Sequence, residues 1–206
     1  MARTGKPRSS SVSKSISAFG EDACHRIVIG TLIERVAEQM NVEAAIKWHN
    51  SIRGQPRVVR ELKEYFRDLE NRGGWPDLIV VVMDANDKGW NKRIRDIPKN
   101  ASPVPVVRAI PEPYIESWLM LDNEAFSDLF GKGFQTPKKN FKHNRDFYKH
   151  ALREAYIQTG SDDDIGVIDI AKKIAPKINL KPASGGNKSL KRFLKELRDA
   201  LQQTSH

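Results

Sequence analysis

The 206-residue chain contains a single cysteine, which rules out a disulfide framework. Cys24 occupies a helical position among Ile27 and Val28, where we expect a core thiol. No apolar run approaches the roughly 20 residues of a membrane span, and no hydrophobic region follows the basic residues of the N-terminus. We therefore expect a protein without membrane spans in a reducing cytoplasm.

Two common kinds of site are also missing. The histidines show no pairing with cysteine at the spacing of a zinc site. Residues 185–189, GGNKS, contain a Lys-Ser pair after glycine, but they lack the spacing and the preceding apolar strand of a phosphate-binding loop. We therefore expect no zinc centre and no ATP hydrolysis by this chain, so that any ATPase involved would be another polypeptide.

Positive charge, by contrast, is abundant. Lys and Arg number 35 against 26 Asp and Glu, which gives a formal net charge of +9. Such a balance favours a polyanionic partner such as nucleic acid. A charge that serves only solubility would look the same in the composition, so both interpretations stay open at this point.

The chain divides into a tail, an alternating region and a helical region. Residues 1–14 carry basic residues and serines but no acid, so we expect a disordered basic tail. Strands are predicted near residues 16–19, 43–48, 78–83 and 104–110, with helices after residue 20, from residue 56, around residues 91–96 and from residue 114. This alternation predicts an α/β fold over residues 15–122, with a mostly parallel sheet flanked by helices. Residues 123–206 are predicted to form a helical part packed on this core.

Acidic side chains follow two of the predicted strands. Glu21 comes after the first strand, and Asp84 and Asp87 follow the apolar run of the third. In parallel sheets ligands bind at the carboxyl ends of the strands, so these acids should gather at one edge. Carboxylates brought together repel one another unless a cation lies between them, and hard oxygen ligands indicate Mg²⁺ or Mn²⁺. Such an ion could serve phosphodiester chemistry.

At these residues the chain resembles the TOPRIM domain of topoisomerases, bacterial primases and OLD-type nucleases. Gly20 and Glu21 resemble its glutamate motif, and residues 84–87, DAND, resemble its aspartate motif. Residues 110–119, IPEPYIESWL, are similar to a stretch of small stand-alone TOPRIM-like proteins that are encoded beside ABC-type ATPases in bacterial antiphage modules. Residues 188–193, KSLKRF, resemble the terminal Ser-x-x-x-Phe helix of those proteins. The resemblance covers most of the chain.

The resemblance implies a TOPRIM-like fold and a set of metal ligands. Glu21 and Asp84 would bind one or two Mg²⁺ or Mn²⁺ ions, and Glu116 would complete the acidic cluster. In the family the second aspartate lies two residues after the first, where this chain has Asn86. Either Asp87 supplies the second carboxylate, or Asn86 coordinates through its carbonyl oxygen with one negative charge less.

Each of these residues also has an ordinary structural interpretation. Asp84 could cap a helix or close a turn after the strand, since Asp and Asn favour such positions. Asn86 and Asp87 could form a polar turn leading to Gly89. Glu116 could occupy the exposed side of an apolar helix, and Trp118, two residues later, is predicted to anchor the core.

Two groups of basic residues remain. The first mixes lysines and arginines with aromatic residues over residues 132–153, a mixture suited to nucleic acid but also to packing of the helical part. The second lies on the last predicted helix and is compatible with a solvated face. Lys188 lies at the start of that helix, where a cation gains nothing from the helix dipole. A lysine held there could contact a phosphate, and Lys191 is the second candidate for this contact.

Together these features predict a metal-dependent nuclease that acts on DNA or RNA. The resemblance implies the effector subunit of an antiphage system with a partner ATPase. The alternative is a catalytically inert TOPRIM-like subunit that binds nucleic acid or the ATPase, with Asn86 marking a lost site.

Overall fold

The fold is built on a four-stranded parallel sheet, as the alternating pattern predicted. The computed structural model describes residues 12–50, 55–98, 101–131, 144, 146–158 and 165–203. Within these ranges the strands are β1 (Val12–Gly20), β2 (Val42–Asn50), β3 (Leu78–Val82) and β4 (Val106–Ala109). They lie in the order β2-β1-β3-β4, and every neighbouring pair is parallel.

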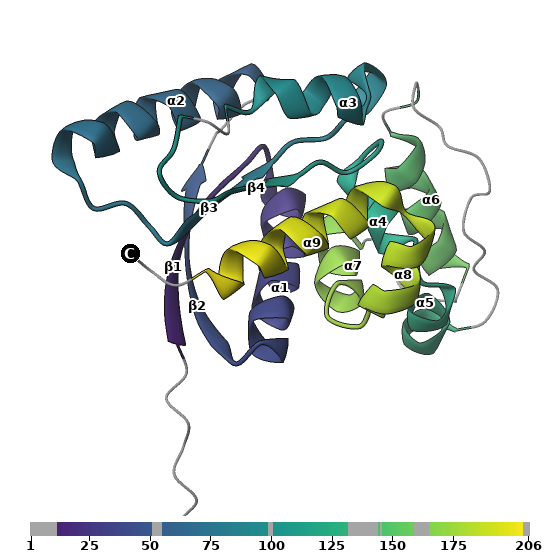
Figure 1. The fold of residues 1–206 in the computed structure, drawn as a ribbon. Coiled ribbons are helices and arrows are strands. Elements are labelled where there is room, and N and C mark those ends of the chain that lie inside the picture. The colour runs from purple at the N-terminus through teal and green to yellow at the C-terminus, as the bar shows by residue number, and fades with distance from the viewer. Residues whose placement is uncertain are drawn as a thin grey trace, which may run out of the picture.

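Helices flank the sheet and make up the C-terminal part (Figure 1). Those between the strands are α1 (Ala23–Gln39), α2 (Gln55–Arg72) and α3 (Trp90–Arg93), with short 3-10 helices η1 (Asn86–Lys88) and η2 (Ile94–Asp96). After β4 come α4 (Ile115–Leu119), α5 (Asn123–Phe130), α6 (Phe147–Ile157), α7 (Val167–Ile174), α8 (Leu180–Gly186) and α9 (Lys188–Gln202). No helix in the described ranges has both the length and the hydropathy needed to cross a bilayer.

Apolar side chains fill both faces of the sheet. β3 is buried along its whole length, as expected for a central strand with helices on both sides. One face packs against α2, and the other packs against α1 and the C-terminal helices α4 to α9 in a single larger cluster. Cys24 is buried in this larger cluster, as predicted. The C-terminal helices therefore share a core with the sheet.

The first strand starts earlier than predicted. β1 begins at Val12, so Lys14 belongs to the strand and not to the predicted tail. Lys14 is only 3% exposed, and its Nζ donates a hydrogen bond to the carbonyl oxygen of Gln203 (2.8 Å) and lies 3.4 Å from Asp77 Oδ1. A buried ammonium needs such partners, which sequence patterns do not reveal. Residues 1–11 of the predicted tail lie outside the described residues.

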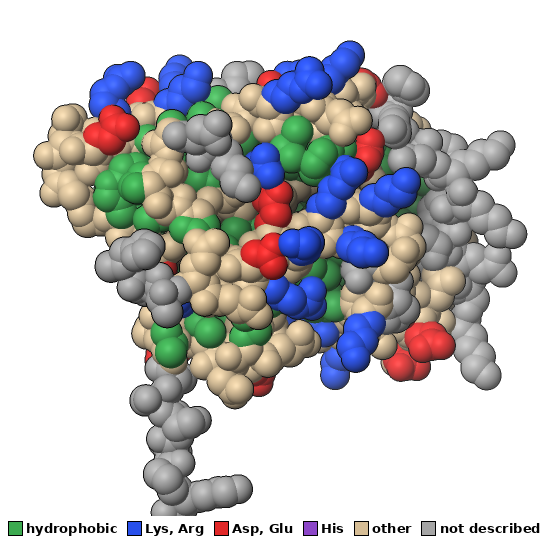
Figure 2. All heavy atoms as spheres, viewed as in Figure 1, with side chains coloured by type: hydrophobic (Ala, Val, Ile, Leu, Met, Phe, Trp, Pro, Cys, Tyr) green, Lys and Arg blue, Asp and Glu red, His purple; other side chains and the backbone are tan. Residues whose placement is uncertain are grey.

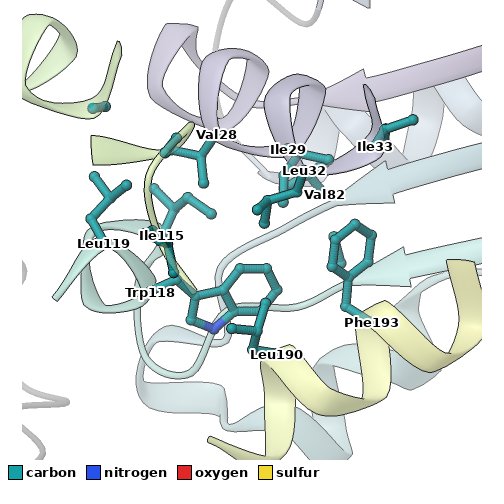
Figure 3. Packing of buried hydrophobic residues seen from close by; sticks show 14 of the residues in the cluster. Val28, Ile29, Leu32, Ile33, Val82, Ile115, Trp118, Leu119, Leu190 and Phe193 are labelled. Atoms are coloured by element: carbon teal, nitrogen blue, oxygen red, sulfur yellow. The ribbon is translucent and has the colours of Figure 1, made fainter. Parts of the chain in front are cut away.

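Trp118 joins α4 to α9. Its side chain is 1% exposed, as expected of the core anchor predicted from the sequence. The indole Nε1 donates a hydrogen bond to Ser189 Oγ (3.0 Å), and the ring lies 5.7 Å from that of Phe193. Figure 3 shows Trp118 facing Leu190 and Phe193 of α9. Two of the four motifs that carry the resemblance, residues 110–119 and 188–193, thus meet in one contact.

Trp118→Ala should destabilise the fold strongly, because it removes a buried aromatic ring and leaves a cavity. We expect a loss of about 3–5 kcal/mol in the free energy of unfolding, measured by urea denaturation followed by circular dichroism. Trp75→Ala is the matched control, because Trp75 is only half-buried on the other face of the sheet. Equal losses in the two variants would contradict the role of Trp118 as an anchor.

Candidate functional site

The predicted acids follow two adjacent strands, β1 and β3. The connection after β1 leads to β2 on one side of the pair, and the connection after β3 leads to β4 on the other side. α/β sheets bind ligands where neighbouring connections lead in opposite directions in this way. Phe19 of β1 is level with Val81 of β3. Glu21 and Asp84 therefore leave neighbouring strands at nearly the same height, at the same edge of the sheet.

Backbone hydrogen bonds tie the segment after β3 to the segment after β4. The amides of Met83, Ala85 and Asn86 donate to the carbonyl oxygens of Ala109 (3.0 Å), Pro111 (2.8 Å) and Pro113 (3.0 Å), respectively. This pairing carries the chain from β4 past Asp84 and directly into α4. Glu116, in the first turn of α4, is thereby brought to the acidic edge.

Asp84 also has the capping role that the sequence left open. Its Oδ1 accepts a hydrogen bond from the backbone amide of Ile115, at the start of α4 (2.8 Å). Its carbonyl oxygen accepts a hydrogen bond from Arg93 Nε (3.0 Å). Asp84 therefore holds neighbouring segments in place as well as contributing charge.

His25, which the sequence analysis did not single out, lies among the acids. It is 0% exposed; its Nε2 lies 3.1 Å from Asp84 Oδ1 and its Nδ1 3.6 Å from Asp22 Oδ1. Burial lowers the pKa of His25, but the charge and hydrogen bond of Asp84 and the charges of Asp22 and Glu21 outweigh it and raise the pKa to about 9. A buried cation thus lies inside the acidic cluster at neutral pH. The available sequence signal was a histidine within an apolar helical stripe, three residues after a helix-capping aspartate.

Glu116 does not lie on an exposed face of its helix, so that alternative is wrong. Its side chain is 3% exposed. Burial, followed by the charge of Asp84, raises the pKa of Glu116 to about 7. Lys149 of α6 approaches it, with Nζ 3.8 Å from Glu116 Oε1. Asp84 is therefore close enough for its charge to oppose the ionisation of Glu116.

Asn86 and Asp87 form the polar turn that was their ordinary interpretation. Asn86 has a φ of 49°, in the left-handed region that asparagine tolerates better than most residues, and it begins η1. Asp87 is exposed in the same turn. The strongest charge effects on His25 come from Asp84, Asp22 and Glu21. Within the aspartate motif, Asp84 is thus the residue that interacts most strongly with His25.

The donor set suits a hard divalent cation, since it consists of carboxylate oxygens on separate segments. Across the part of the chain that the structure describes, however, no three Asp, Glu, His or Cys side chains are arranged closely enough to hold a metal ion. Positive charge reaches the acids from His25 and Lys149 instead. The resemblance implies Glu21, Asp84 and Glu116 as the metal ligands, and all three interact electrostatically with His25.

The lysines predicted to contact phosphate lie on the first turn of α9 and are exposed. Asn187 caps this helix by accepting a hydrogen bond from the Leu190 amide (3.0 Å). Within the described ranges no acid forms an ion pair with Lys188 or Lys191. Nearby, the Arg192 guanidinium lies 3.9 Å from the centre of the Trp90 ring. Figure 2 shows Lys and Arg side chains gathered over the face that α9 forms.

The first predicted basic cluster, over residues 132–153, lies mostly outside the described residues. Positions 132–143 and residue 145 are not described, so five of its basic residues cannot be placed: Lys132, Lys138, Lys139, Lys142 and Arg145. Of the rest, Lys149 contacts Glu116 and Arg153 is exposed on α6. This cluster therefore contributes one described residue to the site, namely Lys149.

Comparison with known proteins adds no assignment. No protein-family model matches the chain, and neither the curated proteins nor the solved structures gave a match. The TOPRIM resemblance depends on its motifs alone, and the site depends on the contacts described above.

Glu116→Gln should remove a titration that destabilises the folded protein as the pH rises. The pKa of about 7 in the folded state exceeds the ordinary 4.5, so between these values the folded state keeps a proton that the unfolded state releases. The contribution of Glu116 to stability is thus fully present below pH 4.5 and is lost as the pH passes 7. Relative to the variant, the wild type should lose up to about 3 kcal/mol of unfolding free energy over this range.

Urea denaturation at a series of pH values measures this difference. Glu124→Gln is the matched control, since Glu124 is an exposed acid in the first turn of α5. Removing this exposed charge should change the free energy of unfolding far less than Glu116→Gln does. A difference for Glu116→Gln that is the same at every pH would contradict the burial of a titrating carboxyl group.

Proposed function

We propose that this protein is a metal-dependent nuclease of the TOPRIM-like class, which cleaves phosphodiester bonds of DNA or RNA in the cytoplasm. The observation that carries the proposal is the convergence of Glu21 and Asp84 at the carboxyl edge of adjacent strands, with Glu116 beside Asp84. A divalent cation would offset the repulsion between these acids in place of the proton on His25. Exposed lysines on α9 support a polyanionic substrate.

In this proposal Glu21, Asp84 and Glu116 hold Mg²⁺ or Mn²⁺, with Asn86 and Asp87 as the further candidates from the aspartate motif. When bound, the ion would polarise a phosphoryl oxygen and lower the pKa of a water molecule.

The chain's own side chains would contribute position, charge and proton transfer. Ile115 fixes the Asp84 carboxylate through its amide. Lys188 and Lys191 steady the phosphate of the substrate. Glu116 would give up its proton when it binds the ion, because a nearby cation favours the charged carboxylate.

The biological setting is proposed from the sequence resemblance. The small TOPRIM-like proteins with the Glu-x-Trp-Leu stretch are encoded beside ABC-type ATPases in antiphage modules. We infer an ATPase subunit as partner and a role as the effector of a defence system, which is an argument by analogy. The missing phosphate-binding loop agrees with ATP hydrolysis by a different chain.

Glu21→Gln and Asp84→Asn should each abolish Mg²⁺-dependent cleavage. Asparagine at position 84 keeps an oxygen that can accept the Ile115 amide, so this variant removes charge while it preserves the cap of α4. We expect a loss of roughly 100-fold or more, measured on labelled single-stranded and duplex DNA and RNA. Asp128→Asn, at an exposed position of α5, serves as the control and should cleave normally. Full activity in either site variant would remove the metal-site proposal.

A second candidate function is a catalytically inert subunit that binds nucleic acid or its ATPase. The contact between His25 and Asp84 favours it, because the histidine already supplies the positive charge that a metal would bring.

Calorimetric titration with Mg²⁺ and Mn²⁺ separates the two functions. A nuclease should bind at least one of these ions, and Asp84→Asn should weaken binding at least tenfold. Because a bound ion would compete with the proton of His25, binding should tighten as the pH rises towards 9. A wild type that binds neither ion favours the inert subunit.

A further inference from the structure

β2 forms one edge of the sheet and is unusually open for a strand of nine residues. It pairs with β1 along its whole length, and no other described segment pairs with its second side. A strand edge of this kind presents a row of backbone amide and carbonyl groups that can accept another strand.

The two faces of β2 differ in character. Glu43, Ala45 and Lys47 are exposed on the face towards which α2 lies. The opposite face carries apolar side chains that pack against the larger core cluster and remain only half-buried: Val42, Ala44, Ile46 and Trp48. The edge therefore combines two opposite charges on one face with incompletely covered apolar surface on the other.

These residues are self-complementary in an antiparallel arrangement. If a second copy of β2 lies antiparallel with Ala45 on a two-fold axis, Glu43 of each copy is directly opposite Lys47 of the other. Directly opposite residues in antiparallel strands have Cβ atoms about 4.5–5.5 Å apart, within reach of an ion pair. The small side chain of Ala45 meets its own counterpart at the axis.

Neighbouring registers lack this match. A shift of the axis to Ala44 places Glu43 opposite Ala45, and a shift to Ile46 places Lys47 opposite Ala45. Shifts that move the axis between residues put exposed positions opposite half-buried ones, which the two faces disfavour. The charges thus select one register.

The apolar face fits the same register. It brings Ile46 and Trp48 of the second copy opposite Ala44 and Val42, so the half-buried surfaces cover one another. A hollow of about 360 Å³ lies beside Val42 and Ala44, where the approaching side chains find space.

We propose that two copies of this chain associate through β2, so that their sheets join into one continuous sheet with two Glu43–Lys47 ion pairs across the axis. This inference goes beyond the proposed nuclease function and does not depend on it. The competing explanation is that the charges of β2 prevent its edge from pairing with another strand. In that case the chain would be a monomer whichever way these charges are arranged.

Charge reversal and its compensation test the pairing. For the full wild-type chain, sedimentation equilibrium should give a dimer of twice the 23.4 kDa chain mass, with a measurable Kd. Glu43→Lys and Lys47→Glu should each raise the Kd at least tenfold, because like charges then oppose one another twice across the axis. The double variant Glu43→Lys/Lys47→Glu should restore the wild-type Kd. Lys63→Glu, at an exposed position of α2, is the control and should leave the Kd unchanged.

A monomeric wild type, single variants with an unchanged Kd, or a double variant that stays dissociated would each overturn the proposal.

Cross-linking gives an independent measurement that needs no change of charge. Ala45→Cys should form an intermolecular disulfide under mild oxidation, since the axis brings the two thiols together. Ser13→Cys, exposed on the inner neighbour β1, should not do so, and Cys24 is buried. Equal cross-linking at positions 13 and 45 would also contradict the register.

Discussion

The carboxylate of Asp84 is the interaction on which the candidate site depends. One of its oxygens accepts the amide of Ile115 and contacts His25 Nε2, so it joins the end of β3 to α4 and to α1. The backbone oxygen of the same residue is held by Arg93, which is itself buried. Because four segments meet at this one residue, the positions of His25 and of Glu116, which follows Ile115, depend on it.

Asp84 can hold these segments together only if the charges around it are balanced. Glu116 and Asp84 repel each other in a poorly hydrated place, and burial adds a cost for each charge. Protonated His25 offsets part of that repulsion, and Lys149 offsets more from the side of α6. A divalent cation would satisfy the same electrostatic need with two charges instead of one. In the proposed nuclease a bound metal would therefore take the place of the internal cation, whereas the inert subunit would keep that cation.

The sequence predicted the parts of this arrangement that depend on local pattern. Alternating strands and helices were enough to place Glu21 and Asp84 at one edge, because the topology of a parallel sheet fixes where strands end. The resemblance contributed Glu116, whose apolar neighbours gave no sign of a site.

What could not be predicted depends on contacts between distant residues. The largest contribution that raises the pKa of His25 comes from Asp84, 59 positions away. Lys14 can be buried because Gln203 and Asp77 provide oxygen partners for its ammonium group. At Asn86 the sequence offered both a metal ligand and a polar turn, and the positive φ of its backbone shows the turn.

The contact between α4 and α9 explains why two motifs far apart in sequence occur together. Ser189 and Phe193 both touch Trp118, so the Glu-x-Trp-Leu stretch and the Ser-x-x-x-Phe helix form two sides of one interface. Once Trp118 is fixed, Glu116 is fixed two residues before it, and Lys188 is fixed one residue before Ser189. The basic start of α9 is thereby held to the same short helix that carries the buried acid. The indole hydrogen bond and the ring packing hold α4 and α9 together. The core of the protein therefore determines how Glu116 and Lys188 lie relative to one another.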